Sequence, residues 1–436
     1  MWVKRGRLGT TQYLHHNVTS DANNYGLIHF DTNNQIEMMM TTSGSHTIKR
    51  VTNRVFRDTS AWYHFVFVTD VNNSTAQNRM RIYVNGVEET SFSTNDSPSG
   101  ASNRFYEASA SNDHVIGANS AGTGNFDGSM SHVYNIVDTV YTPSAFGSTD
   151  STTGQWKINT SPSVTFGSQG YLILKDSNTI TDQSINSNDF TLGAGNLTKT
   201  EDCPDNIFNC WDVNYVTKYD TDVSTMYIRN GNTTFNAGSS AKKGWKVGTM
   251  SVTSGKYYWE AKVVDNGRMY MGIAYPQELA NTSNAFYDNT TFTAITIDNG
   301  GSVQGINGQS YSSGVSFPNG SYVGFALDMD NKALYIRKNN DAWINSGNPT
   351  SGSSRTGSVI EQLSGSRDNY LGLDVVSPLV GDPSTSGTHN SEFNFGNGSF
   401  GITQLTGTTY QATGLGIFKY QPPTGYTALC TKGVNL

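Results

Sequence analysis

The sequence predicts an all-β protein built from two antiparallel β-sandwiches. Charged residues make up only 14% of the 436 residues, and glycine is abundant with 45 copies. Such a composition favours strands and turns over helices. No stretch of ten or more residues shows a clean helical period. Several stretches instead alternate apolar and polar residues with the period of two that is typical of a half-buried strand.

The clearest alternation lies in residues 254–274, which we take as the centre of the second half of the chain. Tyr257, Trp259, Ala261 and Val263 alternate there with Tyr258, Glu260 and Lys262. Asp265-Asn266-Gly267 is a tight-turn signal, because Asn and Gly tolerate positive φ. Met269, Met271 and Ile273 then form the apolar face of a return strand. The stretch is therefore predicted to be one β-hairpin.

Residues 1–150 are predicted to form a separate all-β domain. Its expected strands are residues 62–70, 79–88 with an Asn85-Gly86 turn, 114–117 and 126–135. Residues 140–147 are expected to hold a short helix.

The order of four motifs in these residues resembles the laminin-G-like, concanavalin A-like jelly roll. They are WYHF at 62–65, RIYVNGV at 81–87, VIG at 115–117 and FDGSMSHVY at 126–134. The family has one or two strands before its equivalent of residues 2–6, and here the sequence starts at Met1. The resemblance therefore implies one of two alternatives: the sequence is an N-terminally trimmed version of a longer protein, or the sandwich has an open edge beside residues 2–6, near Phe65, Phe67 and Val133. We expect another chain to complete that edge, preferably in a homotrimer; the alternative is that a strand around Leu172 fills it.

Four further motifs resemble, in order, those of SPRY domains. They are GKYYWE at 255–260, YVGFALD at 322–328, WINSGNP at 343–349 and FNFG at 393–396. The NSGNP form and GYTALC at 425–430 resemble the SPRY variant of phage and marine viral proteins. The resemblance implies a β-sandwich that binds partners and performs no chemistry.

The domain boundaries follow from these motifs. We predict a jelly roll over residues 1–150, a connector over 151–205 with a returning strand near 170–174, and a SPRY-like sandwich over 206–417. Residues 418–436 are expected to form a tail that packs on the SPRY-like domain.

Catalytic motifs are missing from the sequence. It holds no nucleophile elbow, phosphate loop or spaced Cys and His metal pattern. His15 and His16 are adjacent and are predicted to be exposed, while His64 is predicted to lie in the core.

Glycoside hydrolases use two carboxylates that face one cleft. Asp328 and Asp330 are more simply explained as turn residues. Glu88 and Glu89 are neighbours and would point to opposite faces of a strand. We therefore predict that the protein is not an enzyme.

Candidate binding residues come from the two resemblances. The SPRY resemblance implies ligand contacts at Asn266, Arg268, Trp343 and Asn345, with the alternative that Trp343 packs its own loop. An aromatic side chain with neighbouring amides can stack on a sugar and bind its hydroxyls. The laminin-G resemblance implies calcium as a candidate cofactor, held by Asn119, Asn125 and Asp127; the alternative is that these are ordinary loop residues. Hard oxygen ligands suit calcium.

The charge and the hydropathy of the sequence limit the classes of partner that we expect. The net charge of −7 argues against a broad surface for nucleic acid. No apolar run approaches the roughly 18 residues of a membrane span. The three cysteines, Cys203, Cys210 and Cys430, argue against a disulfide framework. Pairing of Cys203 with Cys210 stays open, although free thiols are favoured.

The function that these observations favour is that of a non-enzymatic virion protein. We expect a tail fibre, spike or capsid decoration that is exposed on the particle and adheres to a host surface glycan or protein, with other virion proteins as neighbours. One alternative is a bacterial or host surface adhesin. A second, from another class, is a polysaccharide-degrading enzyme.

Overall fold

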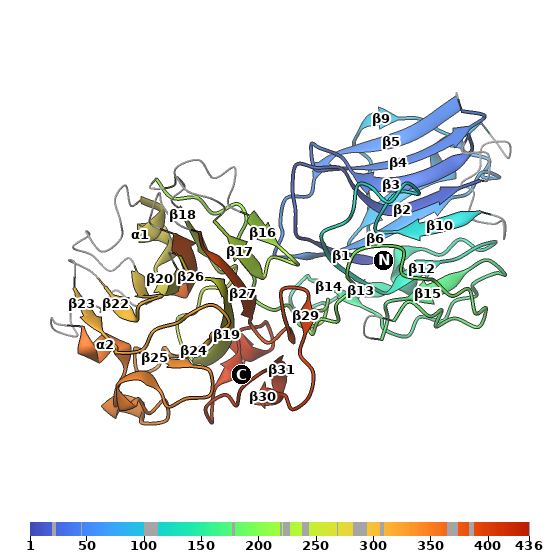
Figure 1. The fold of residues 1–436 in the computed structure, drawn as a ribbon. Coiled ribbons are helices and arrows are strands. Elements are labelled where there is room, and N and C mark those ends of the chain that lie inside the picture. The colour runs from blue at the N-terminus through green and yellow to red at the C-terminus, as the bar shows by residue number, and fades with distance from the viewer. Residues whose placement is uncertain are drawn as a thin grey trace. The chain divides into compact units, whose positions relative to one another are not determined.

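The protein is nearly all β, with 42% of residues in strands and 7% in helices, which confirms the predicted fold class. The computed structural model describes residues 1–19, 23–44, 46–99, 112–176, 179–218, 220, 227–237, 244–267, 269–281, 294–305, 309–363, 374–382 and 388–435. The chain divides into two compact units, Met1–Leu197 (unit 1) and Thr198–Leu436 (unit 2) (Figure 1).

Unit 1 contains two larger antiparallel sheets. The first has the order β11 (Gly128–Ser131), β1 (Trp2–Arg5), β6 (Trp62–Thr69), β7 (Met80–Val84) and β8 (Val87–Glu88). The second has the order β10 (Asp113–Ile116), β2 (Gln12–Val18), β3 (Tyr25–Phe30), β4 (Gln35–Thr42), β5 (His46–Val55) and β9 (Phe92–Asn95). Their facing side chains form one apolar core around Phe30, Phe56 and Phe65, all fully buried.

Local turn chemistry explains the β7–β8 hairpin. Asn85 and Gly86 have φ values of 49° and 83°, the two positive angles that a two-residue hairpin of this kind needs. A Cβ on Gly86 would lie 2.4 Å from the Trp156 ring, so only glycine fits this turn. The predicted Asn-Gly turn is confirmed.

The first strand of unit 1 corrects one expectation. β1 is paired on both sides, with β11 through Trp2 and Ser131 and with β6 through Trp2 and His64. The predicted open edge beside residues 2–6 is therefore wrong, because β11 fills it.

The strand predicted at 126–135 is broken in the structure. His132 has φ of 50°, and it separates β11 from β12 (Val133–Asn135). β12 pairs instead with β15 (Tyr171–Ile173), where Tyr134 lies opposite Leu172. Leu172 therefore lies beside β12 and not beside β1. The predicted short helix is a 3₁₀ turn at Pro143–Ala145, and it leads into a small pair, β13 (Gly147–Thr149) with β14 (Trp156–Ile158).

Unit 2 also contains two larger sheets. One has the order β16 (Tyr227–Arg229), β17 (Thr234–Asn236), β27 (Asn390–Asn394), β19 (Lys256–Asp265), β24 (Tyr322–Asp328) and β25 (Ala333–Lys338), and β32 (Thr427–Ala428) also pairs with β19. The other has the order β18 (Gly244–Val247), β26 (Ser377–Asp382), β20 (Tyr270–Ala274), β21 (Ala294–Asp298), β22 (Ser302–Gln304) and β23 (Ser310–Ser312).

Short elements complete unit 2. The described α-helices are α1 (Pro276–Asn281) and α2 (Val359–Gln362). The small strand pairs are β28 (Ser399–Phe400) with β29 (Thr403–Gln404) and β30 (Tyr410–Ala412) with β31 (Leu415–Phe418).

The predicted hairpin over residues 254–274 is wrong. β19 pairs with β24 and β27, whereas β20 pairs with β21 and β26 in the other sheet. The chain therefore crosses from one sheet to the other after Asp265. The apolar residues of both strands, Trp259 and Met271 among them, meet in the core between the sheets.

β19 is buried on both faces, although its alternation predicted a half-buried strand. Trp259 stacks on Phe325 with ring centroids 5.3 Å apart, inside the core between the sheets. Tyr258 and Glu260, on the other face, are also fully buried. They are covered by the C-terminal segment, whose Phe418, Tyr426 and Ala428 pack on this face in a second apolar cluster.

The predicted domain boundaries differ from the observed units. Residues 151–197, predicted as a connector, lie in unit 1, and residues 198–205 lie in unit 2. The tail expected at 418–436 contributes β32 to the larger sheet of unit 2 through its parallel pairing with Tyr257 and Tyr258.

Burial of Trp259 gives a stability prediction. Trp259 is 1% exposed, so Trp259→Ala should lower the free energy of unfolding of unit 2 by about 3–5 kcal/mol, the range for deleting a core aromatic side chain. The melting transition of unit 1 should stay where it is, because its core is separate. Differential scanning calorimetry resolves both transitions. Trp343→Ala, at a half-buried position, is the matched control and should cost less; an unshifted unit 2 transition in Trp259→Ala would contradict the assignment.

Candidate binding sites

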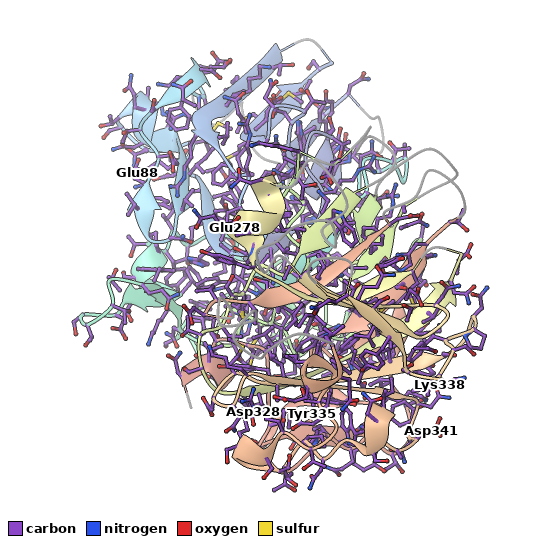
Figure 2. The ribbon with its side chains drawn as sticks, turned by 90° about the vertical axis from the view of Figure 1, so that its left-hand side faces the viewer. Glu88, Glu278, Asp328, Tyr335, Lys338 and Asp341 are labelled. Carbon is purple, nitrogen blue, oxygen red and sulfur yellow. The ribbon has the colours of Figure 1, made fainter. Side chains whose placement is uncertain are left out.

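The candidate catalytic carboxylates have structural partners. Asp328 is buried at the end of β24, where its carboxylate accepts from the Asn331 backbone at 3.0 Å and lies 3.1 Å from the Lys256 ammonium. Asp330 accepts from the Gly255 backbone at 2.7 Å. Figure 2 shows Asp328 beside Tyr335, with Lys338 and Asp341 further along the same side of unit 2. The Asn331 bond closes the turn after β24, and the contacts with Gly255 and Lys256 tie this turn to the start of β19.

The other candidate pair lies at the surface of unit 1. Glu88 is exposed at the edge strand β8 (Figure 2). The Glu89 carboxylate lies 2.8 Å from the Arg54 guanidinium in an exposed ion pair. In the described part of the chain, neither residue lines a cleft together with a second carboxylate.

Asn266 belongs to the corner between the two sheets of unit 2. Its backbone N–H donates to the Asn319 side chain at 2.9 Å, and its amide nitrogen donates to the Phe317 carbonyl at 3.0 Å. Both contacts fix the corner to the loop before β24. The neighbouring candidate, Arg268, lies outside the described residues.

Trp343 lies against Arg337 of β25. The Arg337 guanidinium carbon is 4.7 Å from the centre of the Trp343 ring, and the Tyr335 ring meets it edge-on at 6.5 Å. Arg337 is itself held by hydrogen bonds to the Tyr258 hydroxyl at 2.9 Å and the Gln421 carbonyl at 2.8 Å. One face of the indole is thus covered, and the side chain remains half-buried.

Asn345 lies two residues further on and faces another element. Its amide donates to the Tyr311 hydroxyl of β23 at 2.7 Å, and its φ is 60°. Trp343 and Asn345 therefore come from one loop but make contacts with different sheets. Among the described residues, no hydrogen bond or ring contact joins either of them to Asn266.

A row of aromatic and cationic side chains continues from Trp343 along this side of unit 2. The Arg337 guanidinium lies 6.0 Å from the Tyr420 ring, which meets Tyr322 at 5.8 Å. The Lys419 ammonium lies 4.8 Å from the Tyr322 ring. We call Trp343, Arg337, Tyr420, Tyr322 and Lys419 the aromatic row. Sequence patterns did not indicate it, because its members come from three separate segments.

The candidate calcium residues lie in the loop after β10. The Asn119 side-chain oxygen accepts from the backbone of Ala121 at 3.1 Å and of Thr123 at 2.9 Å, so it closes its own turn. Asn125 is exposed, and the Asp127 carbonyl accepts from Gly6 at 2.8 Å. In the described part of the chain, no cluster of three or more His, Cys, Asp or Glu side chains could hold a metal ion. Calcium stays a prediction that rests on resemblance.

The histidines of unit 1 are mostly buried and neutral. His15 and His16 are 4% and 8% exposed, so the prediction that this pair is exposed is wrong. Burial, aided by His114 and His16, lowers the pKa of His15 to about 3. His64 is in the core as predicted, accepts from the Trp156 indole at 3.1 Å, and has its pKa lowered to about 2, mainly by burial.

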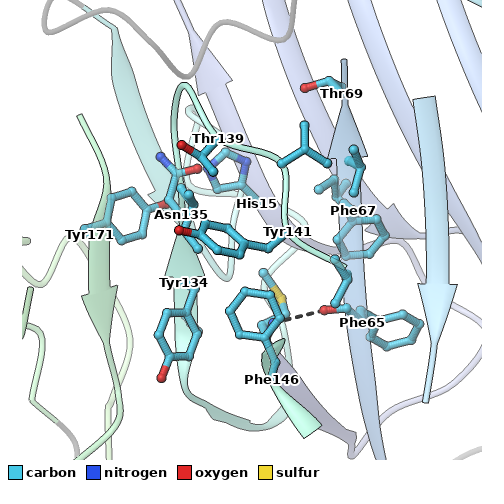
Figure 3. Close-up of a pocket in the computed structure, with 17 residues that line it drawn as sticks. His15, Phe65, Phe67, Thr69, Tyr134, Asn135, Thr139, Tyr141, Phe146 and Tyr171 are labelled. Carbon is cyan, nitrogen blue, oxygen red and sulfur yellow. Dashed lines mark hydrogen bonds between the residues drawn. The ribbon is translucent and has the colours of Figure 1, made fainter. Parts of the chain in front are cut away.

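Unit 1 contains a partly open cavity of about 140 Å³ that the sequence analysis did not identify. Residues 65–69 of β6 form one wall and residues 133–135 of β12 another (Figure 3). Further lining comes from the segment after β12, at Ile136, Thr139, Val140, Tyr141 and Phe146. The Met1 amine lies at one end and donates to the Phe65 carbonyl at 3.0 Å, the bond drawn in Figure 3. Phe65, Phe67 and Val133, expected beside an uncovered edge, all line this cavity.

Two further observations bear on partners and thiols. Within the described ranges, no helix has the length and apolar character that crossing a membrane requires.

All three cysteines are free thiols, with Cys210 and Cys430 buried.

Comparison with known proteins supports the fold. Residues 1–145 match the family model of the concanavalin A-like lectin/glucanases superfamily. Among solved structures, the SPRY domain of human HERC1 is a distant likeness, with 18% identity over 42% of this chain and 96% of that one and a TM-score of 0.30. No curated protein matches the chain. The jelly-roll match and the all-β architecture fit a binding or adhesion domain.

The buried histidines give a prediction about pH. His15, His64 and His132 have folded-state pKa values lowered to about 3, 2 and 4 from 6.5, mainly by burial. The unfolded chain therefore binds more protons below pH 6.5. Unit 1 should keep its full stability above pH 6.5 and lose about 1.4 kcal/mol per histidine for each pH unit below it.

Thermal melting of unit 1 between pH 7.5 and pH 5 tests this. A fall in melting temperature is expected, and His64→Gln should show a shallower fall because one such group is removed. Equal melting temperatures of the native chain at both pH values would show that these histidines are not held neutral.

Proposed function

We propose that this chain is a non-enzymatic adhesion protein of a virion, which binds a host surface glycan. The jelly-roll match supports a binding module, and the sequence resemblance to phage and marine viral proteins supports the virion. A tail fibre, spike or capsid decoration would present both units on the outside of the particle. A bacterial or host surface adhesin is the alternative with the same domains.

The aromatic row is the observation that carries the glycan proposal. Trp343, Tyr420 and Tyr322 are half-buried and offer ring surface, and Lys419 lies between two of these rings. Ring faces stack on the apolar face of a sugar, and cations attract carboxylate or sulfate groups. The ligand that fits this row is an acidic glycan.

Oligomerisation remains part of the proposal on resemblance alone. Appendage proteins that resemble this one are commonly trimeric, and a trimer would present three copies of the row to one surface. The gain in avidity from such an arrangement needs no new contact. Other virion proteins are the expected neighbours.

A glycan array tests the binding proposal. Trp343→Ala and Tyr420→Ala should each weaken binding to acidic glycans by about 1.5 kcal/mol, roughly tenfold in Kd. Higher salt should weaken it further, because the Lys419 ammonium is only partly buried. Tyr410→Ala, at a half-buried tyrosine of β30, is the control and should bind as the native chain does. Binding that survives both row substitutions in stably folded variants would refute this site.

The proposal that the protein is not an enzyme has a separate test. Incubation with acidic polysaccharide should release no reducing sugar, because the carboxylates of Asp328 and Asp330 are engaged in a turn. Sustained turnover that is lost in a folded Asp328→Asn variant would overturn this and favour the polysaccharide-degrading alternative.

A further inference from the structure

Arg337 is the least exposed member of the aromatic row, with 6% of its surface exposed. Its guanidinium carbon lies 4.7 Å from the centre of the Trp343 ring and 6.0 Å from that of the Tyr420 ring. Both of these rings are half-buried. The positive charge of Arg337 therefore lies at the base of the row, next to two rings that reach the surface.

A glycine on the neighbouring strand allows the Arg337 side chain to take this position. Gly324 of β24 lies opposite Arg337 of β25 in the sheet. A Cβ at Gly324 would lie 3.1 Å from both Cγ and Nε of Arg337. The arginine side chain thus crosses β24 at a residue that has no side chain. Beyond β24, its guanidinium donates to the Tyr258 hydroxyl of β19 at 2.9 Å.

Most of the Arg337 donors have no partner within the described part of the chain. A guanidinium carries five N–H groups. Arg337 donates to the Tyr258 hydroxyl and to the Gln421 carbonyl, in both cases from Nη2. Among the described residues, Nε and Nη1 have no hydrogen-bond partner. Buried polar groups are almost always hydrogen-bonded, so these donors indicate a partner from outside the chain, either water or a bound ligand.

The charge of Arg337 is also not directly paired. Among the described residues, no carboxylate forms an ion pair with Arg337. The Tyr258 hydroxyl connects it to Glu260, to which that hydroxyl donates at 3.0 Å. The Glu260 carboxylate also accepts from the backbone of Lys419 and Tyr420. Burying a cation without a directly bonded anion is costly, and a ligand carboxylate at Nη1 would reduce that cost.

We infer that Arg337 binds the carboxylate of a sugar acid, in which the carboxylate is attached directly to the pyranose ring. The inference rests on the proposed glycan binding and assigns the acidic group of the glycan to one residue. The carboxylate enters between the Trp343 and Tyr420 rings and accepts hydrogen bonds from Nη1. The pyranose ring then lies against these aromatic side chains. Uronic acids and sialic acids both carry such a carboxylate.

The burial of Arg337 favours a carboxylate over a sulfate ester. A carboxylate is planar and presents two oxygens, whereas a sulfate ester is tetrahedral and presents three. The planar group is the smaller of the two and fits more easily between two rings. Lys419 differs from Arg337, because its ammonium is half-buried beside the Tyr322 ring and acts as a point charge that attracts either anion. Arg337 is therefore the residue that determines specificity for a carboxylate.

Binding of methyl glycosides to the 436-residue chain tests this inference. The probes are methyl β-D-glucuronide, methyl β-D-glucoside and the 6-sulfate of that glucoside, which differ only in the group on one carbon. In NMR titrations, the glucuronide should bind roughly tenfold more tightly than the glucoside, because it gains a charge-assisted hydrogen bond to Arg337. The sulfate should bind more weakly than the glucuronide. The methyl glycoside of N-acetylneuraminic acid distinguishes a sialic acid from a uronic acid as the source.

Three variants link the preference to Arg337. Arg337→Met should abolish the tenfold preference for the glucuronide in a protein whose unit 2 still melts cooperatively. Arg54→Met is the matched control, because Arg54 lies in unit 1 in an exposed ion pair with Glu89, and it should keep the preference. Lys419→Met should weaken binding of the glucuronide and the sulfate alike and should leave the preference for the carboxylate.

A measurement on the native chain applies if Arg337→Met does not fold. The guanidinium N–H signals of Arg337 should shift in the NMR spectrum when the glucuronide is added. They should stay in place when the glucoside is added at the same concentration. Signals that do not respond to the glucuronide would overturn the inference without any variant.

Several other outcomes would also overturn the inference. They are equal affinity for the glucuronide and the glucoside, a sulfate that binds as tightly as the glucuronide, and no binding of either sugar acid. A preference that survives in folded Arg337→Met but is lost in Lys419→Met would assign the acidic group to Lys419. That result would leave the proposed function standing, because its test depends on Trp343→Ala and Tyr420→Ala, so the two proposals can be told apart.

Discussion

The architecture of unit 2 depends on one buried carboxylate. Glu260 is fully buried in the middle of β19, and it accepts hydrogen bonds from the backbone of Lys419 at 2.9 Å and Tyr420 at 2.8 Å and from the Tyr258 hydroxyl at 3.0 Å. Burial raises its pKa to about 6 in spite of these bonds. Removing the partners of a buried charge costs several kcal/mol. The C-terminal segment must therefore lie on β19 for the sheet to be stable, and the same contact places Tyr420 in the aromatic row.

Strand positions could be predicted from the sequence because local patterns determine them. The alternation around Trp259 reflects one face packed in a core, and the Asn85-Gly86 turn reflects two positive φ angles. Strand partners were harder to predict. The turn signal at residues 265–267 showed where the chain reverses but not which sheet receives β20. That choice depends on β26, about 100 residues further along the chain, whose Val380 lies opposite Met271.

The candidate sites, like the strand partners, could be predicted only in part from the sequence. The sequence indicated Trp343 as an aromatic residue in a loop. It did not indicate that Arg337 covers one face of the Trp343 ring, because this depends on side-chain packing between β25 and the loop. The expectation of an uncovered edge named Phe65, Phe67 and Val133, which line a cavity, but β1 is paired on both sides. β11 pairs with β1 from Gly128 to Ser131, and the left-handed His132 then turns the chain away. A single φ value of this kind has no signature in an apolar pattern.

The position of Glu260 also has a consequence for biosynthesis. The ribosome releases β19 well before residues 419 and 420, which satisfy its carboxylate. Until they emerge, Tyr258 and Glu260 on the outer face of β19 are exposed to solvent. A partly synthesised unit 2 must leave this face open, because water is then the partner of the Glu260 carboxylate. Unit 1, which comprises residues 1–197, can finish folding during this interval. Translation thus separates the two folding events in time, and chaperones would meet unit 2 chiefly as a sheet that lacks its last segment.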